Sequence, residues 1–286
     1  MLNKKSFLMI ASGMLLAVAG STQAALTDGM LGSYDADNAS GNSLPNSVPG
    51  GPGITLAGGV SLGDSSNGTD KKLIFDGSDS FSPIAGGAMG AGSSAVTLEI
   101  WIEDLQDDGS WVGIVASMQG DNGYGFSRGR SSDYNVYASW TDQVNYQHGQ
   151  GGLTKGTGTG VYNDPHQIVM VMDQNAAGTH ELMTMYVDGV KNAHHGRMDG
   201  SQYNYDNFEV ANGPGFFGIG GNWKWGDNVV GNHYAGSLLA VNIWGRGLSE
   251  EEVGASFDDG ANGYVPEPAS LALLTLGGLV ALRRRR

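Results

Sequence analysis

The sequence contains no cysteine and few charged residues, and each of these absences excludes something. Without a Cys among its 286 residues, the chain has no disulfide framework, no thiolate metal site and no thiol nucleophile. Charged residues make up 15% of the chain, whereas 48 residues are glycine. Because glycine in a helix interior costs roughly 1 kcal/mol relative to alanine, this composition is poor for helices. It favours an all-β structure with many turns.

Basic residues are also scarce, with 15 Lys and Arg against 29 Asp and Glu. Six of the basic residues and one acidic residue lie in the two end segments treated next. The body between them therefore has nine basic and 28 acidic residues, a net charge near −19. So acidic a surface repels nucleic acid and anionic lipid and suits solubility or divalent cations. We therefore exclude nucleic-acid binding.

Residues 1–24 have the three parts of a secretory signal peptide. Lys4 and Lys5 precede an apolar stretch from Phe7 to Ala19, and small residues follow, so we expect cleavage after Ala24. The alternative is a membrane anchor, but the apolar run is shorter than the roughly 20 residues that a span needs. The chain is therefore expected to be exported through the inner membrane.

Residues 265–286 combine three unlike elements in a fixed order. They are a proline-flanked acid, an uncharged apolar run and a basic cluster: Pro266, Glu267 and Pro268; Ala269 to Leu282; and Arg283, Arg284, Arg285 and Arg286. The prolines impose an extended, non-helical segment. As a helix the apolar run would be about 21 Å long, short of the roughly 30 Å hydrocarbon core, although snorkelling arginines could close part of that gap. We expect a short transmembrane helix whose Arg cluster stays cytoplasmic.

In this order the three elements resemble the PEP-CTERM sorting signal of Gram-negative bacteria. The resemblance implies that a membrane-embedded exosortase recognises Pro266, Glu267 and Pro268, with Arg283 to Arg286 as the stop. It also implies that the tail inserts transiently and that the protein reaches the cell surface or the extracellular matrix. An ordinary tail anchor with an incidental Pro-Glu-Pro sequence is the alternative.

The body, residues 25–264, contains short apolar or alternating runs separated by Gly, Asn and Asp, which is typical of a β-sandwich. Ala95 to Glu103 alternates cleanly and predicts a strand with an aliphatic core face. His166 to Met172 and Leu182 to Val187 predict an antiparallel hairpin whose far end turns at Asp188-Gly189. Ser237 to Trp244 predicts a last strand.

A helix is predicted directly after that last strand. Ser249 and Glu252 form a capping box, and Val253 and Phe257, four residues apart, form a packing stripe. We expect this helix to be short and peripheral.

Six segments of the body together resemble one known family. They are FDGSDSF (75–81), VTLEIWIE (96–103), HQIVMVMD (166–173), MYVDG (185–189), FFGIGGN (216–222) and YAGSLLAVNIWGRGLSEEEVGASF (234–257). They resemble the laminin G-like branch of the concanavalin A-like lectin/glucanase superfamily. The resemblance implies an all-β, two-sheet antiparallel jelly-roll sandwich over residues 25–264, with a concave face and a rim of loops.

Glu99 and Glu103 are the candidates for glycosidase chemistry, because they share one face of a strand with backbones about 13 Å apart. Retaining hydrolysis needs carboxyl groups about 5–5.5 Å apart, and inverting hydrolysis about 6.5–9.5 Å. Related glucanases place acids on such a strand as Glu-x-Asp-x-Glu, but Trp101 stands here in place of the middle Asp. Losing that acid removes the group that tunes its neighbours. We therefore interpret the strand as structural, with Trp101 covering a sheet face, and keep catalysis as the alternative.

Calcium is the ion that suits the acidic loops, because their Asp and Asn side chains offer oxygen donors. The candidate sets are Asp35 with Asp37, Asp76 with Asp79, and Asp227 with Asn222 and Asn228. Since none has EF-hand spacing, turn formation explains each set equally well.

Aromatic residues with polar neighbours are candidates for carbohydrate contact, because flat rings and hydrogen-bonding groups suit pyranose faces. Trp223 and Trp225 share a face at i and i+2, and Tyr134 and Trp140 are expected in loops. Packing at the sandwich edges is the alternative role for these rings.

Two functions remain after this reading. The leading one is an exported, surface-sorted, non-catalytic binding module for extracellular polysaccharide, matrix or a surface protein. The alternative is a secreted glycan hydrolase or lyase on the same fold.

Overall fold

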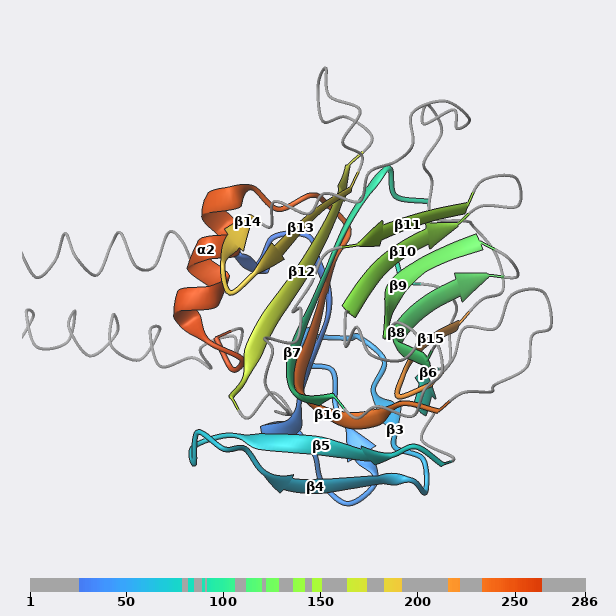
Figure 1. Ribbon diagram of the computed structural model, residues 1–286, viewed down its shortest axis with the longest axis vertical. Helices are drawn as coiled ribbons and strands as arrows, with labels where there is room; N and C mark the ends of the chain where they lie inside the picture. Colours follow the sequence, from blue (N-terminus) through green and yellow to red (C-terminus); the bar gives the residue numbers. More distant parts are fainter. Residues whose placement is uncertain are drawn as a thin grey trace, which may run out of the picture.

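The computed structural model describes residues 26–78, 82–84, 89–90, 92–105, 112–119, 122–128, 136–141, 146–150, 164–173, 183–191, 216–221 and 233–263. In these residues the chain forms two large antiparallel sheets that face each other, with an α-helix on the outer side of the larger sheet (Figure 1). This is the predicted all-β sandwich.

The larger sheet has eight strands in the order β14-β13-β12-β7-β16-β5-β4, with β1 also paired to β16. β5 pairs with the first half of β16 and β1 with its second half. The bounds are β1 Met30–Asp35, β4 Val60–Asp64, β5 Lys71–Asp76, β7 Ala95–Leu105, β12 His166–Asp173, β13 Met183–Val187, β14 Val190–Lys191 and β16 Ala235–Trp244.

The smaller sheet has six strands in the order β11-β10-β9-β8-β15-β6. Their bounds are β6 Ser82–Ile84, β8 Val112–Gln119, β9 Asn122–Arg128, β10 Val136–Thr141, β11 Tyr146–Gln150 and β15 Phe216–Ile219. A two-stranded sheet, β2 Ser43–Leu44 with β3 Ile54–Thr55, and the 3-10 turn η1, Ala36–Asn38, lie between β1 and β4 in the chain.

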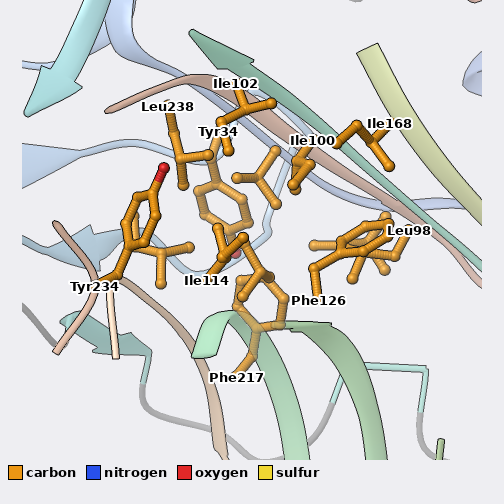
Figure 2. Packing of buried hydrophobic residues seen from close by; sticks show 14 of the residues in the cluster. Tyr34, Leu98, Ile100, Ile102, Ile114, Phe126, Ile168, Phe217, Tyr234 and Leu238 are labelled. Atoms are coloured by element: carbon orange, nitrogen blue, oxygen red, sulfur yellow. The ribbon is translucent and has the colours of Figure 1, made fainter. Parts of the chain in front are cut away.

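The core fills the space between the two large sheets (Figure 2). The alternation of β7 sends Leu98, Ile100 and Ile102 into it, each fully buried. Phe217 of the opposite sheet stacks on Tyr34, with ring centroids 5.8 Å apart. Burial of these side chains from both sheets is what holds the sandwich together, at about 25 cal/mol per Å² of apolar surface.

The outer face of the larger sheet is covered by helix α2, Glu250–Asp259 (Figure 1). The predicted capping box is present: the Oγ of Ser249 accepts from the Glu252 backbone N–H, and the Glu252 carboxylate accepts from the Ser249 backbone N–H. Val253 is fully buried in a second apolar cluster that includes Leu26 and Trp244. The short, peripheral helix predicted from the sequence is therefore confirmed.

The predicted hairpin is also confirmed, because β12 pairs antiparallel with β13. Asp188 and Gly189 join β13 to β14 with φ values of 49° and 72°, as the Asp-Gly pair predicts. The expectation that Trp140 lies in a loop is wrong, because Trp140 is in β10. Residues 136–141 pair through their backbone with β9 and β11, and such pairing between segments is not encoded in the local pattern.

Candidate functional site

Glu99, in the middle of β7, is completely buried and receives hydrogen bonds from three side chains. Its Oε1 accepts from Nε1 of Trp101 at 2.7 Å and from Nδ2 of Asn242 at 3.1 Å. Its Oε2 accepts at 2.6 Å from Oγ of Ser256, a residue of α2. Nε2 of Gln167 donates in turn to Ser256 Oγ at 2.9 Å. This polar network fixes α2 to the sheet.

Glu103 lies four residues further along β7 on the same face, and 3% of its side chain is exposed. Its Oε1 accepts from the Ser66 backbone N–H at 2.8 Å and from Nζ of Lys72 at 3.1 Å. Lys72 also donates to Oδ2 of Asp104 at 2.7 Å. Burial alone would raise the pKa of Glu103, but hydrogen bonds from Ser65, Ser66 and Lys72 outweigh it and lower the pKa. Glu103 is therefore an ionised partner in a structural ion pair.

Trp101 lies between these two acids on the same face and is 6% exposed. Its ring stacks on Phe257 of α2 with centroids 5.9 Å apart and planes 1° apart. The interpretation that Trp101 covers a sheet face is therefore confirmed. Glu99 is buried beneath α2 and Glu103 is buried against Ser66 and Lys72, so neither of these two acids is open for general acid or base chemistry on a glycan.

The first calcium candidate, Asp35 with Asp37, is occupied by local hydrogen bonds. Asp35 caps η1: its Oδ1 accepts from the Asp37 backbone N–H at 2.8 Å and its Oδ2 from Nδ2 of Asn38 at 3.2 Å. Burial raises the pKa of Asp35 to about 6, and the neighbouring charges of Asp37 and Asp70 add to the rise. Asp35 is thus a capping residue held close to two like charges.

The other calcium candidates are only partly described. Asp76 forms the turn after β5, where its Oδ1 accepts from the backbone N–H and the Oγ of Ser78 at 2.7 and 3.0 Å. Asp79 and Asp227 lie outside the described residues. Across the described ranges, no group of three or more His, Asp or Glu side chains is arranged to hold a metal.

Asn262 forms an unpredicted contact at the sheet edge beside η1. Its Nδ2 lies 2.6 Å from Oδ2 of Asp37 and 3.0 Å from Oδ1 of Asp70. The second oxygen of each carboxylate also accepts a hydrogen bond. Oδ1 of Asp37 accepts from the Lys71 backbone N–H, and Oδ2 of Asp70 accepts from Nδ2 of Asn67, both at 2.7 Å. We call Asp37 and Asp70 the acidic edge. No residue spacing in the sequence predicts the contact with Asn262, because its three residues come from separate segments of the chain.

Of the four aromatic candidates for carbohydrate contact, the structure describes the backbone of one. Trp223, Trp225 and Tyr134 lie outside the described residues, and Trp140 is placed by its backbone alone, opposite Tyr124 in the β9–β10 ladder.

The sorting motif, Pro266, Glu267 and Pro268 with Arg283 to Arg286, also lies outside the described residues, as does the predicted signal peptide. In the part of the chain that is described, no helix is long and apolar enough to span a membrane. The predicted tail helix and signal peptide therefore stay predictions.

Comparisons with solved structures support the fold. The binding domain of Paraclostridial Mosquitocidal Protein 1 is 16% identical with a TM-score of 0.56, over 82% of this chain and 53% of that one. The botulinum neurotoxin serotype D ligand binding domain, in complex with N-acetylneuraminic acid, is 12% identical with a TM-score of 0.60, over 84% and 53%. This chain thus spans about half of each toxin domain.

A third solved structure matches over nearly its whole length. Domain 4 of AbnA, a GH43 extracellular arabinanase from Geobacillus stearothermophilus, in complex with arabinotriose, is 16% identical with a TM-score of 0.54. The match covers 79% of this chain and 97% of that domain. At such identities the likeness establishes the fold alone. No curated protein matches the chain.

Family models identify both parts of the chain. The model for the PEP-CTERM protein-sorting motif matches residues 265–286, so the chain carries a signal for export and surface association, and this motif implies processing by an exosortase, a membrane enzyme. The laminin G-type model described as the concanavalin A-like lectin/glucanases superfamily matches residues 76–254, more than half of the chain. The chain therefore belongs to the concanavalin A-like lectin/glucanase superfamily, in its laminin G-like branch.

Proposed function

We propose that the protein is a non-catalytic binding module for extracellular polysaccharide, displayed at the cell surface after its tail is processed. The observation that carries this proposal is the burial of Glu99 and Glu103, which leaves neither of the two candidate acids of β7 open to a glycan. Two structural neighbours were solved with bound sugars, N-acetylneuraminic acid and arabinotriose. These neighbours support a carbohydrate as the ligand class.

The test is a glycan array probed with the secreted protein, run beside a reducing-sugar release assay on the same glycans. We expect binding to a defined group of glycans without release of reducing ends. Trp223→Ala and Trp225→Ala should weaken binding, because the stacking of an indole ring on a sugar face would be lost. Turnover that disappears in Glu99→Gln would instead support the glycan hydrolase or lyase.

Calcium binding at the acidic edge is part of the same proposal. Asp37 and Asp70 offer two carboxylates beside the Asn262 amide, whose Oδ1 is buried and accepts no hydrogen bond. Rotating that amide by 180° would turn its oxygen toward both carboxylates, and oxygen donors of this kind suit calcium. Titration calorimetry with calcium should show binding that Asp70→Asn weakens, and unchanged heats in both proteins would contradict it.

A further inference from the structure

Gln167, near the start of β12, joins a turn of the larger sheet to helix α2. Its side chain is fully buried, and both ends of its amide are used. Its Oε1 accepts from the Gly189 backbone N–H at 3.0 Å, and its Nε2 donates to Oγ of Ser256 at 2.9 Å. Ser256 in turn donates to Oε2 of Glu99 at 2.6 Å. The turn between β13 and β14 is therefore connected to the network that docks α2.

The same turn also meets α2 directly. It leads into β14, which lies against the helix (Figure 1). Gly189 has a φ of 72°, and a Cβ at this position would lie 3.0 Å from the Cβ of Phe257. Glycine suits both this backbone conformation and this close approach. A shift of the turn is therefore passed to α2 by contact with Phe257 as well as through Gln167.

His166 and Asp188 hold this turn to β12. Nδ1 of His166 lies 2.9 Å from Oδ2 of Asp188, and Oδ1 of Asp188 accepts from the Gln167 backbone N–H at 3.0 Å. The Asp188 backbone N–H donates to the Gln167 carbonyl, also at 3.0 Å. One carboxylate thus binds both the ring of His166 and the backbone of Gln167. Loss of the positive charge on the ring removes the Coulombic attraction between the ring and this carboxylate.

The charged groups around His166 favour its protonated form. The hydrogen bond to Asp188 raises the pKa of His166, burial of the ring lowers the pKa by less, and the charges of Asp188 and Asp164 raise it further. By register, the nearest charged residues of the neighbouring elements are Glu103 next to Ile102 on β7, Lys191 on β14 and Asp258 next to Phe257 on α2. The ring therefore stays charged to a higher pH than an ordinary histidine, whose pKa is about 6.5.

We propose that His166 and Asp188 form a pH-dependent latch that fastens helix α2 to the larger sheet through the Asp188-Gly189 turn and Gln167. Because the pKa of His166 is raised in the folded protein, the stabilisation is fully present below the unfolded value of about 6.5 and is lost as pH rises through the folded value. The two side chains are 28% and 34% exposed, and an ion pair of this exposure changes an equilibrium about two- to fivefold. Helix α2 therefore opens more often as the medium becomes alkaline.

The experiment measures hydrogen exchange of the α2 amides in the secreted protein at about pH 6 and about pH 8. Protection factors are compared, because they remove the pH dependence of intrinsic exchange. We expect α2 protection to fall about threefold more in the wild type than in His166→Asn, since Asn places a donor near the position of Nδ1 but does not titrate. Asp188→Asn should also flatten the response, and Asn tolerates the φ of 49° at this position. Equal falls in the wild type and both variants would overturn the latch.

Proton NMR of the imidazole ring tests the latch without reference to the helix. His166 should titrate above about pH 6.5 in the wild type and at a lower pH in Asp188→Asn, because the variant has lost the charge that favours the protonated ring. An unchanged midpoint would show that Asp188 does not hold the charged ring, and the latch would be wrong.

Ser256→Ala tests the route from the turn to the helix. It removes the hydrogen bonds that join Gln167 to α2 and α2 to Glu99, so the pH response of the α2 amides should shrink while the titration of His166 stays unchanged. A response that persists in full would overturn the route through Gln167. Asp258→Asn changes an exposed acid of α2 outside this network and should keep the wild-type response. Loss of the response in this control would show that the charge on the helix, rather than the latch, sets the pH dependence.

Discussion

The two faces of strand β7 are both buried, but they are buried by different chemistry. The inner face is purely aliphatic and meets the opposite sheet, with Leu98, Ile100 and Ile102 fully buried. The outer face carries Glu99 and Trp101 and meets helix α2 through hydrogen bonds and ring stacking.

The two faces therefore have different roles, one in stability and one in positioning α2. Apolar contacts are non-directional, so the inner face supplies stability without fixing a single partner. Hydrogen bonds are directional and costly to leave unmade, so the outer face specifies where α2 docks. The acids that resemble catalytic acids in the sequence serve this docking.

The largest effect should come from the inner face. Ile100→Ala should lower the free energy of unfolding by about 4 kcal/mol, because it removes buried methyl groups and leaves a cavity. Chemical denaturation with a fluorescence readout measures it. Since the inner face holds both sheets together, far-UV dichroism and fluorescence should report one shared transition, and two separate transitions would break the comparison.

Glu99→Ala tests the outer face and should cost about 3 kcal/mol, because buried donors of Trp101, Asn242 and Ser256 lose their acceptor. Hydrogen exchange should show the amides of α2 losing far more protection than those of β7. Glu250→Ala, a change in the same helix outside the network, is the control and should leave that ratio unaltered. Equal loss of protection in helix and strand would mean that the outer face has no separate docking role.

Asp35→Asn should reveal how far Asp35 makes the free energy of unfolding depend on pH, a dependence that the aliphatic side chains of β7 cannot give. Burial raises the pKa of Asp35 in the folded protein to about 6. The contribution of Asp35 to stability is therefore fully present below the unfolded pKa of about 3.9, and it is lost as pH rises through 6. A rise of about two units corresponds to at most about 3 kcal/mol, and we expect about 2. Denaturation from pH 4 to 7 should show the wild type losing stability relative to Asp35→Asn; a constant difference contradicts the assignment.

Ser249→Ala gives the smallest effect and tests the helix apart from its docking network. Removing the N-cap should cost about 1 kcal/mol, because the Glu252 backbone N–H loses its acceptor. Thermal unfolding measures the change. Ser249→Asp should restore most of the stability, since Asp is an equally good cap, and a failure to restore it would show that the hydroxyl has another role.

Features carried by short stretches of sequence could be predicted. The alternation of residues 95–103, the capping box at Ser249 and the Asp188-Gly189 turn depend on neighbours within a few residues, and all three are present. The family was also identifiable, because its strands and last helix follow in a fixed order.

Contacts between distant segments could not be predicted. Ser256 reaches Glu99 across 157 positions, and Asn262 reaches Asp37 across 225. The sequence shows two acids sharing the outer face of β7, but what covers that face depends on where α2 docks. The strand β10 was missed for the same reason, since backbone pairing with β9 and β11 defines it.

The most direct test of the central claim is to measure binding and reducing-end release in the same samples of secreted protein and polysaccharide. The account predicts saturable binding with no release, and equal binding by the wild type and a folded Glu99→Gln variant. Release of reducing ends by the wild type that is lost in Glu99→Gln would contradict it, because a sealed carboxylate cannot act on a glycan.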